Sequence, residues 1–335
     1  MLYYGGLLML NTNSCKRYDY HQSGFTLIEL MISLVLGLII SAAVIQIYII
    51  SVKTSSVQAS GSELQDASVF GLQQLEKKVR LANLGNPATR IDSTTAKGGI
   101  VLTGANLGIT SYTNTGYLTR RAGDSATGTD GWTGISNTSV ASDQLTIQYT
   151  NITGSTLSDC EGSNVEVNDI AIERYFLRPV IGDSSSGAIK NLVLACDAGR
   201  VVNAAAASTI AVFSGTDSRN FGKAGQEFIV NTDQFKVLLG VQYDTGVNAG
   251  KIIYLPSSAY LSITADRPAI TSIKLGLIVH GSTPVLGSTD QTSFILLGQD
   301  NVLKTDTTRS KQVRKTYETT TLLRNARVVN VKTSL

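Results

Sequence analysis

Charged residues and histidines are scarce in this 335-residue chain. Asp, Glu, Lys and Arg make up 16% of it, against about 25% in typical soluble domains, and small polar residues and glycine replace them. This composition favours a body rich in β-strands and loops over a helical one. The two histidines, His21 and His280, are too few and too far apart in sequence for a histidine-based metal site, so no metal or cofactor is expected. The formal net charge of +3 is too small to imply nucleic-acid binding.

Sets of catalytic residues are missing as well. The sequence shows no Ser-His-Asp or Cys-His set, no carboxylate pair that would form a site, and no glycine-rich phosphate loop. Almost no histidine is available for acid–base chemistry. The alternative of a membrane-anchored enzyme is therefore not favoured, and the sequence predicts a protein that is not an enzyme.

A long apolar run follows a polar, mildly basic leader. Residues 1–24 form the leader, and residues 25–50 form a run that carries no charge from Leu30 to Ile45. About 20 apolar residues cover the hydrocarbon core of a bilayer, so this run is predicted to be a membrane-spanning helix. An ordinary secretory signal places its apolar region before the cleavage site, whereas this run comes after Gly24 and would be retained. The basic leader should stay in the cytoplasm, which places the rest of the chain outside the inner membrane. Translation could begin at Met1 or Met9.

Glu29 is a lone carboxylate at the head of the apolar run. An unpaired carboxylate is costly in lipid, and pairing with an ammonium group recovers much of that cost. The nearest candidate partner is the amine that cleavage after Gly24 would expose on Phe25. The alternatives are an interfacial Glu29 that reaches lipid headgroups and, for the whole run, an ordinary single-pass anchor.

Residues 51–86 predict a second, amphipathic half of the same helix. Apolar residues recur every three or four positions from Val57 to Ala82, opposite a polar face. No proline occurs between residues 25 and 86, and Gly85 followed by Pro87 is a helix stop signal. A β-sheet packed on the apolar face would bury it.

Residues 87–335 predict a globular, β-rich domain. Residues 88–141 are weakly patterned and are expected to be loops with a short strand at 100–103. From residue 142 onward, short alternating segments separated by turn residues predict a mainly antiparallel sheet. The fold class is therefore α+β, with a long N-terminal helix packed on that sheet. The expected strands lie at 145–149, 170–177, 191–196, 228–230, 235–243, 252–254, 270–279 and 294–297.

The last 33 residues, 303–335, hold eight basic residues and two acids. This basic tail could meet an acidic neighbouring subunit. The favoured interpretation is a solvated strand edge that its charges protect from unwanted pairing.

The segment from Gly24 to Leu30, G-F-T-L-I-E-L, resembles the class III signal of type IV prepilins, which type IV pilins, minor pilins and type II secretion pseudopilins share. Glycine, phenylalanine and glutamate stand in the order and spacing of that signal. Softer similarities to PilW-type minor pilins occur at 142–149, 159–162, 173–176, 194–196, 235–243, 273–279 and 319–325.

The resemblance implies a pilin-like fold and a structural role. Prepilin peptidase would cleave between Gly24 and Phe25 and methylate the new amine of Phe25. Glu29 would neutralise a Phe25 amine, on its own or a neighbouring subunit, during assembly. The implied function is a minor pilin that primes or takes part in type IV pilus assembly and twitching motility, at or near the pilus tip.

The partners implied are other minor pilins and the major pilin, through the N-terminal helix, together with prepilin peptidase. The subunit would sit in the inner membrane with a periplasmic body, then at the cell surface in the pilus. The alternatives are a type II secretion pseudopilin of the J kind and a tip subunit that acts as an adhesin or binds DNA.

The chain has three cysteines, and Cys15 would leave with the leader. Cys160 and Cys196 remain, and an even number in an exported chain predicts a disulfide in an oxidising compartment. Two separate buried thiols are the alternative.

Overall fold

The computed structural model describes residues 24–108, 118–121, 134–185, 187–201, 222–244, 247–285, 291–307 and 311–326, without the side chains of residues 66–69 and 201. The leader before Gly24, much of the segment predicted as loops at 88–141 and the end of the basic tail lie outside these residues. The chain divides into two compact units, residues 1–52 and 53–335. Each unit is described by itself.

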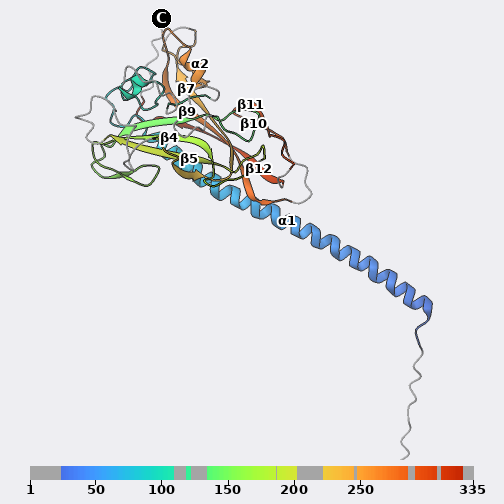
Figure 1. Ribbon diagram of the computed structural model, residues 1–335. Helices are drawn as coiled ribbons and strands as arrows, with labels where there is room; N and C mark the ends of the chain where they lie inside the picture. The colour runs from blue at the N-terminus through green and yellow to red at the C-terminus, as the bar shows by residue number, and fades with distance from the viewer. Residues whose placement is uncertain are drawn as a thin grey trace, which may run out of the picture. The chain divides into compact units, whose positions relative to one another are not determined.

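One helix, α1 (Leu27–Leu81), passes through both units and is coloured blue in Figure 1. In the first unit its large apolar side chains, from Leu27 to Val52, are exposed. Within the described residues, α1 is the one helix long and apolar enough to cross a membrane, judged by length and composition.

The helix ends at Leu81, five residues before the predicted end at Asn86. Asn83 adopts the left-handed conformation (φ 65°), two residues before Gly85 does the same (φ 73°). The backbone N–H of Asn83 donates to the carbonyl of Gln148, 3.0 Å away. Because this bond turns the chain toward a strand, α1 cannot continue to the glycine that the sequence suggests as its stop.

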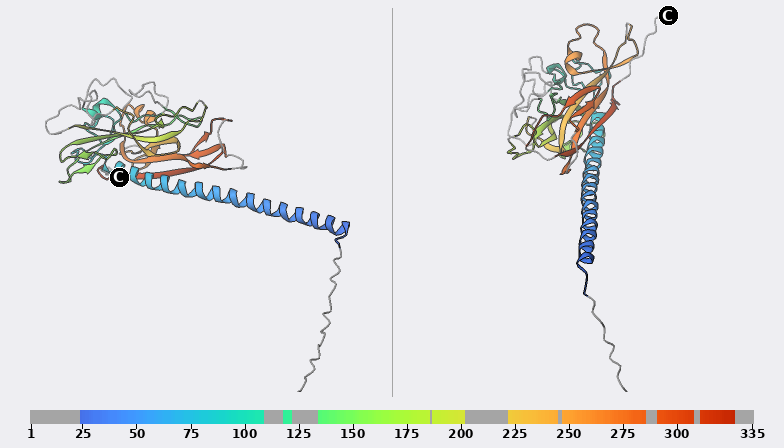
Figure 2. Two further views of the ribbon diagram at one scale, coloured as in Figure 1. Left: turned by 60° about the horizontal axis from the view of Figure 1, so that its bottom comes forward. Right: turned by 90° about the vertical axis from the view of Figure 1, so that its right-hand side faces the viewer.

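The second unit contains two four-stranded antiparallel sheets (Figures 1 and 2). Their strand orders are β1-β4-β5-β6 and β12-β9-β7-β8. Two small hairpins, β2–β3 and β10–β11, accompany them, with a 3-10 helix η1 (Gly104–Leu107) and a short helix α2 (Ser257–Leu261). The α+β class is therefore observed, with the antiparallel strands divided between separate sheets. The strands are β1 Leu145–Thr150, β2 Leu157–Ser158, β3 Asn164–Val165, β4 Ile170–Pro179, β5 Leu192–Val201, β6 Gln226–Ile229, β7 Thr232–Gln242, β8 Ile252–Leu255, β9 Ala269–Pro284, β10 Ser293–Leu296, β11 Gln299–Val302 and β12 Gln312–Leu322.

Each predicted strand from residue 145 onward overlaps an observed one, whereas the expected strand at 100–103 is wrong. In that segment Ile100 forms only an isolated bridge with Ile147. Strands β2, β3 and β11 are not among the expected strands, and β12 falls in the basic tail, for which a strand edge without stated bounds is the favoured interpretation. Strand β12 does lie at the edge of its sheet, as that interpretation requires.

The main core lies between the buried face of α1 and both sheets. Leu64, Leu75 and Val79 of α1 are almost fully buried, in one cluster with side chains such as Leu194 and Leu275. Val57, expected on the same apolar face, is 44% exposed, so the buried apolar face of α1 begins after it.

The polar end of β9 contacts the helix one residue before Val57, where the Ser56 hydroxyl donates to the carbonyl of Pro284 at 2.7 Å.

Buried asparagines organise the loops that follow α1. The side-chain oxygen of Asn106 accepts the N–H groups of Leu102 and Thr103, and its amide donates to the carbonyls of Asp92 and Thr95 at 2.9 Å each. Buried backbone groups need such partners when no ladder supplies them. The loops are therefore ordered by side-chain hydrogen bonds instead of strand pairing.

Candidate processing site and disulfide region

Thr26 and Glu29 form a capped helix start at the predicted processing site. The backbone N–H of Glu29 donates to the Thr26 hydroxyl oxygen at 3.3 Å, and that hydroxyl lies 3.5 Å from Glu29 Oε2. Thr26 and Glu29 have the Thr-x-x-Glu spacing of a capping box, in which the threonine occupies the cap position. The Thr-x-x-Glu spacing is visible in the sequence and by itself predicts this cap.

Gly24 and Phe25 precede the first helical residue. Both are exposed, and the Phe25 side chain is 84% exposed. The peptide bond between them lies just before α1, with exposed residues on both sides. Glu29 stands in the first turn of α1, close in sequence to this bond.

The comparisons with known proteins bear on the same segment. Residues 19–45 match the family model of the prokaryotic N-terminal methylation motif. The methylation motif therefore includes Gly24, Phe25 and Glu29. No curated protein matches the chain.

The structure is also similar to a type IV-like pilin from Thermus thermophilus. The two chains are 10% identical, the overlap covers 79% of this chain and 97% of the pilin, and the TM-score is 0.36. The overlap covers most of both chains, but the structural similarity is low. The description of the fold therefore depends on the observed helix and sheets and not on this similarity.

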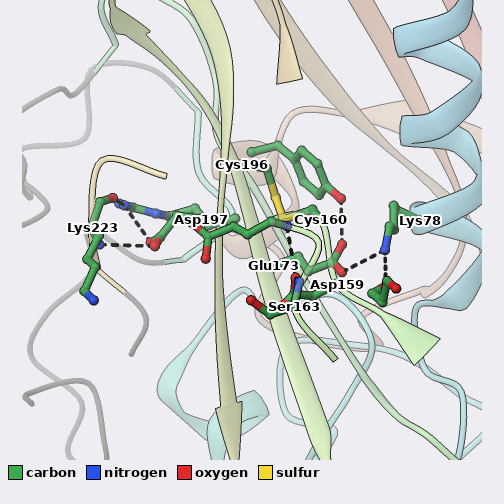
Figure 3. The surroundings of a disulfide bond; sticks show 12 residues. Lys78, Asp159, Cys160, Ser163, Glu173, Cys196, Asp197 and Lys223 are labelled. Carbon is green, nitrogen blue, oxygen red and sulfur yellow. Dashed lines mark hydrogen bonds and ion pairs between the residues drawn. A yellow bond between two sulfur atoms is a disulfide. The ribbon is translucent and has the colours of Figure 1, made fainter. Parts of the chain in front are cut away.

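A disulfide joins Cys160, just after β2, to Cys196 on β5, and closes a sequence separation of 36 residues (Figure 3). The Cα atoms are 6.1 Å apart, within the usual range for a disulfide. Cys196 is fully buried in the main core, and Cys160 packs against that core. Together with Glu173, the two cysteines form a group of three possible metal ligands. The two sulfurs are bonded to each other, and the ammonium group of Lys78 lies beside Glu173. This arrangement suits a disulfide better than a metal.

Glu173 is a fully buried carboxylate beside this disulfide. It accepts hydrogen bonds from the hydroxyls of Tyr149 at 3.0 Å and Tyr175 at 2.6 Å. Lys78 of α1 places its Nζ 3.5 Å from Glu173 Oε1. Burial raises the pKa of Glu173, while the Lys78 charge and the two hydroxyls oppose that rise. Burial and the Glu173 charge likewise raise the pKa values of Tyr149 and Tyr175.

More buried ion pairs surround the disulfide. Asp159 pairs with Arg200 of β5, and both side chains are nearly fully buried. Arg174 of β4 pairs with Asp197 at 3.0 Å. Burial, followed by the charges of Asp197 and Asp159, raises the pKa of Glu161 to about 7. Buried charges of this kind need partners to be tolerated.

A second buried cluster surrounds Asp233 on β7. Its carboxylate accepts a hydrogen bond from Arg314 Nε at 2.9 Å and one from the Asn137 amide at 2.6 Å, and His280 Nδ1 lies 3.1 Å away. Burial alone would raise the pKa of Asp233, but the nearby His280 and the charge of Arg314 lower it. The side chain of Arg314, which belongs to the basic tail, is only 4% exposed, so the tail is not uniformly a solvated edge.

Lys78, Glu173 and Asp233 are not among the site residues expected from the sequence. Glu173 and Arg174 stood inside a predicted apolar strand, and two adjacent charges in such a strand are the signal that could have indicated a buried pair. Lys78 lay beside polar-face residues and gave no such signal.

Proposed function

We propose that this chain is a minor pilin, similar to the PilW type, that primes or takes part in type IV pilus assembly at or near the pilus tip. The supporting observation is the methylation motif at residues 19–45, with Glu29 in the first helical turn. The apolar half of α1 would hold the subunit in the inner membrane until extraction. The body would then lie in the periplasm and later on the cell surface.

Under this proposal, Gly24 and Phe25 flank the cleaved bond and Glu29 pairs with a methylated Phe25 amine. An ammonium–carboxylate pair compensates two charges that would each be costly in an apolar environment. After cleavage the Phe25 amine would lie one residue before Thr26, which caps the helix. The partners are the helices of other minor pilins and the major pilin, and prepilin peptidase is the processing enzyme.

Mass spectrometry of the mature protein tests the processing step, and Glu29→Gln tests assembly. The mature chain should begin with N-methylated Phe25. Glu29→Gln should still insert in the membrane but yield few surface pili, since an amide cannot neutralise the amine. Glu166→Gln, an exposed acid in the body, is the control and should assemble normally. An unmethylated or uncut N-terminus, or normal piliation of Glu29→Gln, would contradict the proposal.

A type II secretion pseudopilin of the J kind carries the same type of signal and remains the competing assignment. Deletion of the gene distinguishes them. Loss of twitching and surface pili supports the minor pilin, whereas loss of exoprotein secretion supports the pseudopilin. A tip subunit that is an adhesin or binds DNA would instead show salt-dependent binding by the mature protein.

A further inference from the structure

The hairpin β2–β3 connects the disulfide to the helix through three consecutive residues. Ser158 ends β2, Asp159 follows, and Cys160 carries the sulfur bonded to Cys196. The carbonyl of Ser158 accepts a hydrogen bond from Lys78 Nζ at 2.5 Å. A covalent bond at Cys160 therefore restrains a carbonyl only two residues away, and that carbonyl contacts α1.

Lys78 is placed between two acceptors from different parts of the body. Its Nζ contacts the Ser158 carbonyl and, at 3.5 Å, the Glu173 carboxylate of β4. The Lys78 side chain is 16% exposed and that of Glu173 is 0% exposed. Figure 3 shows Lys78 reaching from α1 toward Glu173, with the disulfide on the other side of that carboxylate. An ammonium in such a position depends on every acceptor, because little water is available to replace one.

The same strands also link Glu173 to the disulfide. Tyr175, which donates to Glu173, is paired in register with Cys196 on β5. The neighbouring cluster of Tyr149, Val165 and Ala171 packs against Leu81 at the end of α1 and Leu157 of the hairpin. The end of the helix, the hairpin and the disulfide thus form one continuous set of contacts.

We propose that the Cys160–Cys196 disulfide is a redox-dependent control on how firmly the end of α1 is held against the body, and that Lys78 is the positioning residue through which it acts. In the oxidised protein the hairpin presents the Ser158 carbonyl to Lys78. In the reduced protein the hairpin keeps the Asp159–Arg200 ion pair but loses its covalent tie, so the carbonyl moves away and the end of α1 opens more often. This inference does not depend on the assignment as a pilin.

The redox step is a thiol–disulfide exchange. The two thiols of Cys160 and Cys196 lose two protons and two electrons as the sulfur–sulfur bond forms. An oxidant of the protein disulfide class accepts them, and its own disulfide becomes a dithiol. Only a subunit that has met this oxidant would then carry a firmly held helix end.

Hydrogen exchange on the full-length chain in detergent tests the proposal. Reduction should accelerate exchange of residues 72–82 about tenfold, with little change in β9 on the other sheet. Lys78→Met in the oxidised state should give a similar acceleration, and reduction of that variant should add less than about twofold, because both changes remove the same contact. Lys77→Met, an exposed neighbour on the same helix, is the matched control and should exchange like the unmodified chain.

A second variant covers the case in which Lys78→Met fails to fold because it leaves Glu173 unpaired. Lys78→Met with Glu173→Gln removes both charges, and its helix end should also respond little to reduction. Additive effects of reduction and Lys78 substitution in either variant would overturn the proposal. Equal acceleration in β9 and residues 72–82 would overturn it too, since that pattern indicates a general loss of stability.

Discussion

At Asn83, just after the helix ends, a single side chain joins four parts of the chain. Its oxygen accepts the N–H of Gly99 at 3.0 Å, and its amide donates to the carbonyls of Ala88 at 2.8 Å and Asn325 at 3.0 Å. The side chain is fully buried and the backbone is left-handed. Asparagine tolerates that conformation better than most residues, so one residue meets both the backbone and the hydrogen-bond requirement.

Asn83→Ala should destabilise the protein by about 3 kcal/mol. It leaves the buried N–H and carbonyl groups that Asn83 contacts without a hydrogen-bond partner, and it places alanine at a positive φ. Asn168→Ala is the matched control, since Asn168 is also left-handed (φ 73°) but exposed. It should cost only about 1 kcal/mol, the backbone part of the effect. Chemical denaturation of the full-length chain in detergent measures both values. Equal losses would show that the buried hydrogen bonds of Asn83 contribute nothing.

At the scale of elements, α1 changes its surroundings along its length. Gly61 has open space around the position of a side chain, whereas a Cβ at Gly71 would lie 2.5 Å from Cγ1 of the buried Ile229 on β6. The glycine at 71 therefore allows close packing of helix and sheet. No close contact of this kind requires glycine at position 61, where it only lowers the local helix propensity.

The two glycines predict opposite effects of one substitution in one helix. Gly61→Ala should stabilise the protein by about 0.5–1 kcal/mol through helix propensity. Gly71→Ala should destabilise it by about 1–3 kcal/mol, since Ile229 must move within a packed core. Thermal unfolding of the two variants beside the unmodified chain measures the difference. A stabilising Gly71→Ala would mean that β6 does not pack against α1 as described.

For the molecule as a whole, two buried carboxylates give stability opposite dependences on pH. The pKa of Glu173 is raised, so the folded protein binds more protons than the unfolded one, and stability falls as pH rises above about 4.3 toward the folded pKa. The pKa of Asp233 is lowered, so its contribution is present above about 3.9 and is lost as pH falls through the folded pKa.

Substitution by the neutral amide separates the two effects. Glu173→Gln should flatten the loss of stability above about pH 4.3, and Asp233→Asn should flatten the loss on the acid side, below about pH 3.9. Denaturation of the full-length chain at a series of pH values measures both slopes. Each variant serves as the control for the other, and an unchanged slope in either one would contradict the role given to its carboxylate.

Much of the fold could be predicted from local patterns, but little of the buried polar structure could. The alternation around residues 235–243 locates β7 closely, because side chains of a strand point to opposite faces at a period of two. Periodicity did not predict the structure of residues 88–108. Their order depends on Asn106, whose partners lie from 3 to 14 residues away and follow no period.

The sequence by itself determined the methylation motif, the apolar and amphipathic parts of α1 and most strands. Each follows from residues close together in the chain, through backbone periodicity and the length that a bilayer requires. Only the tertiary structure decided that α1 ends at Leu81, that the strands form two sheets, and that Lys78 meets Glu173 beside the disulfide. These depend on groups far apart in sequence, and the free energy of a buried charge is set by the partners that folding brings to it.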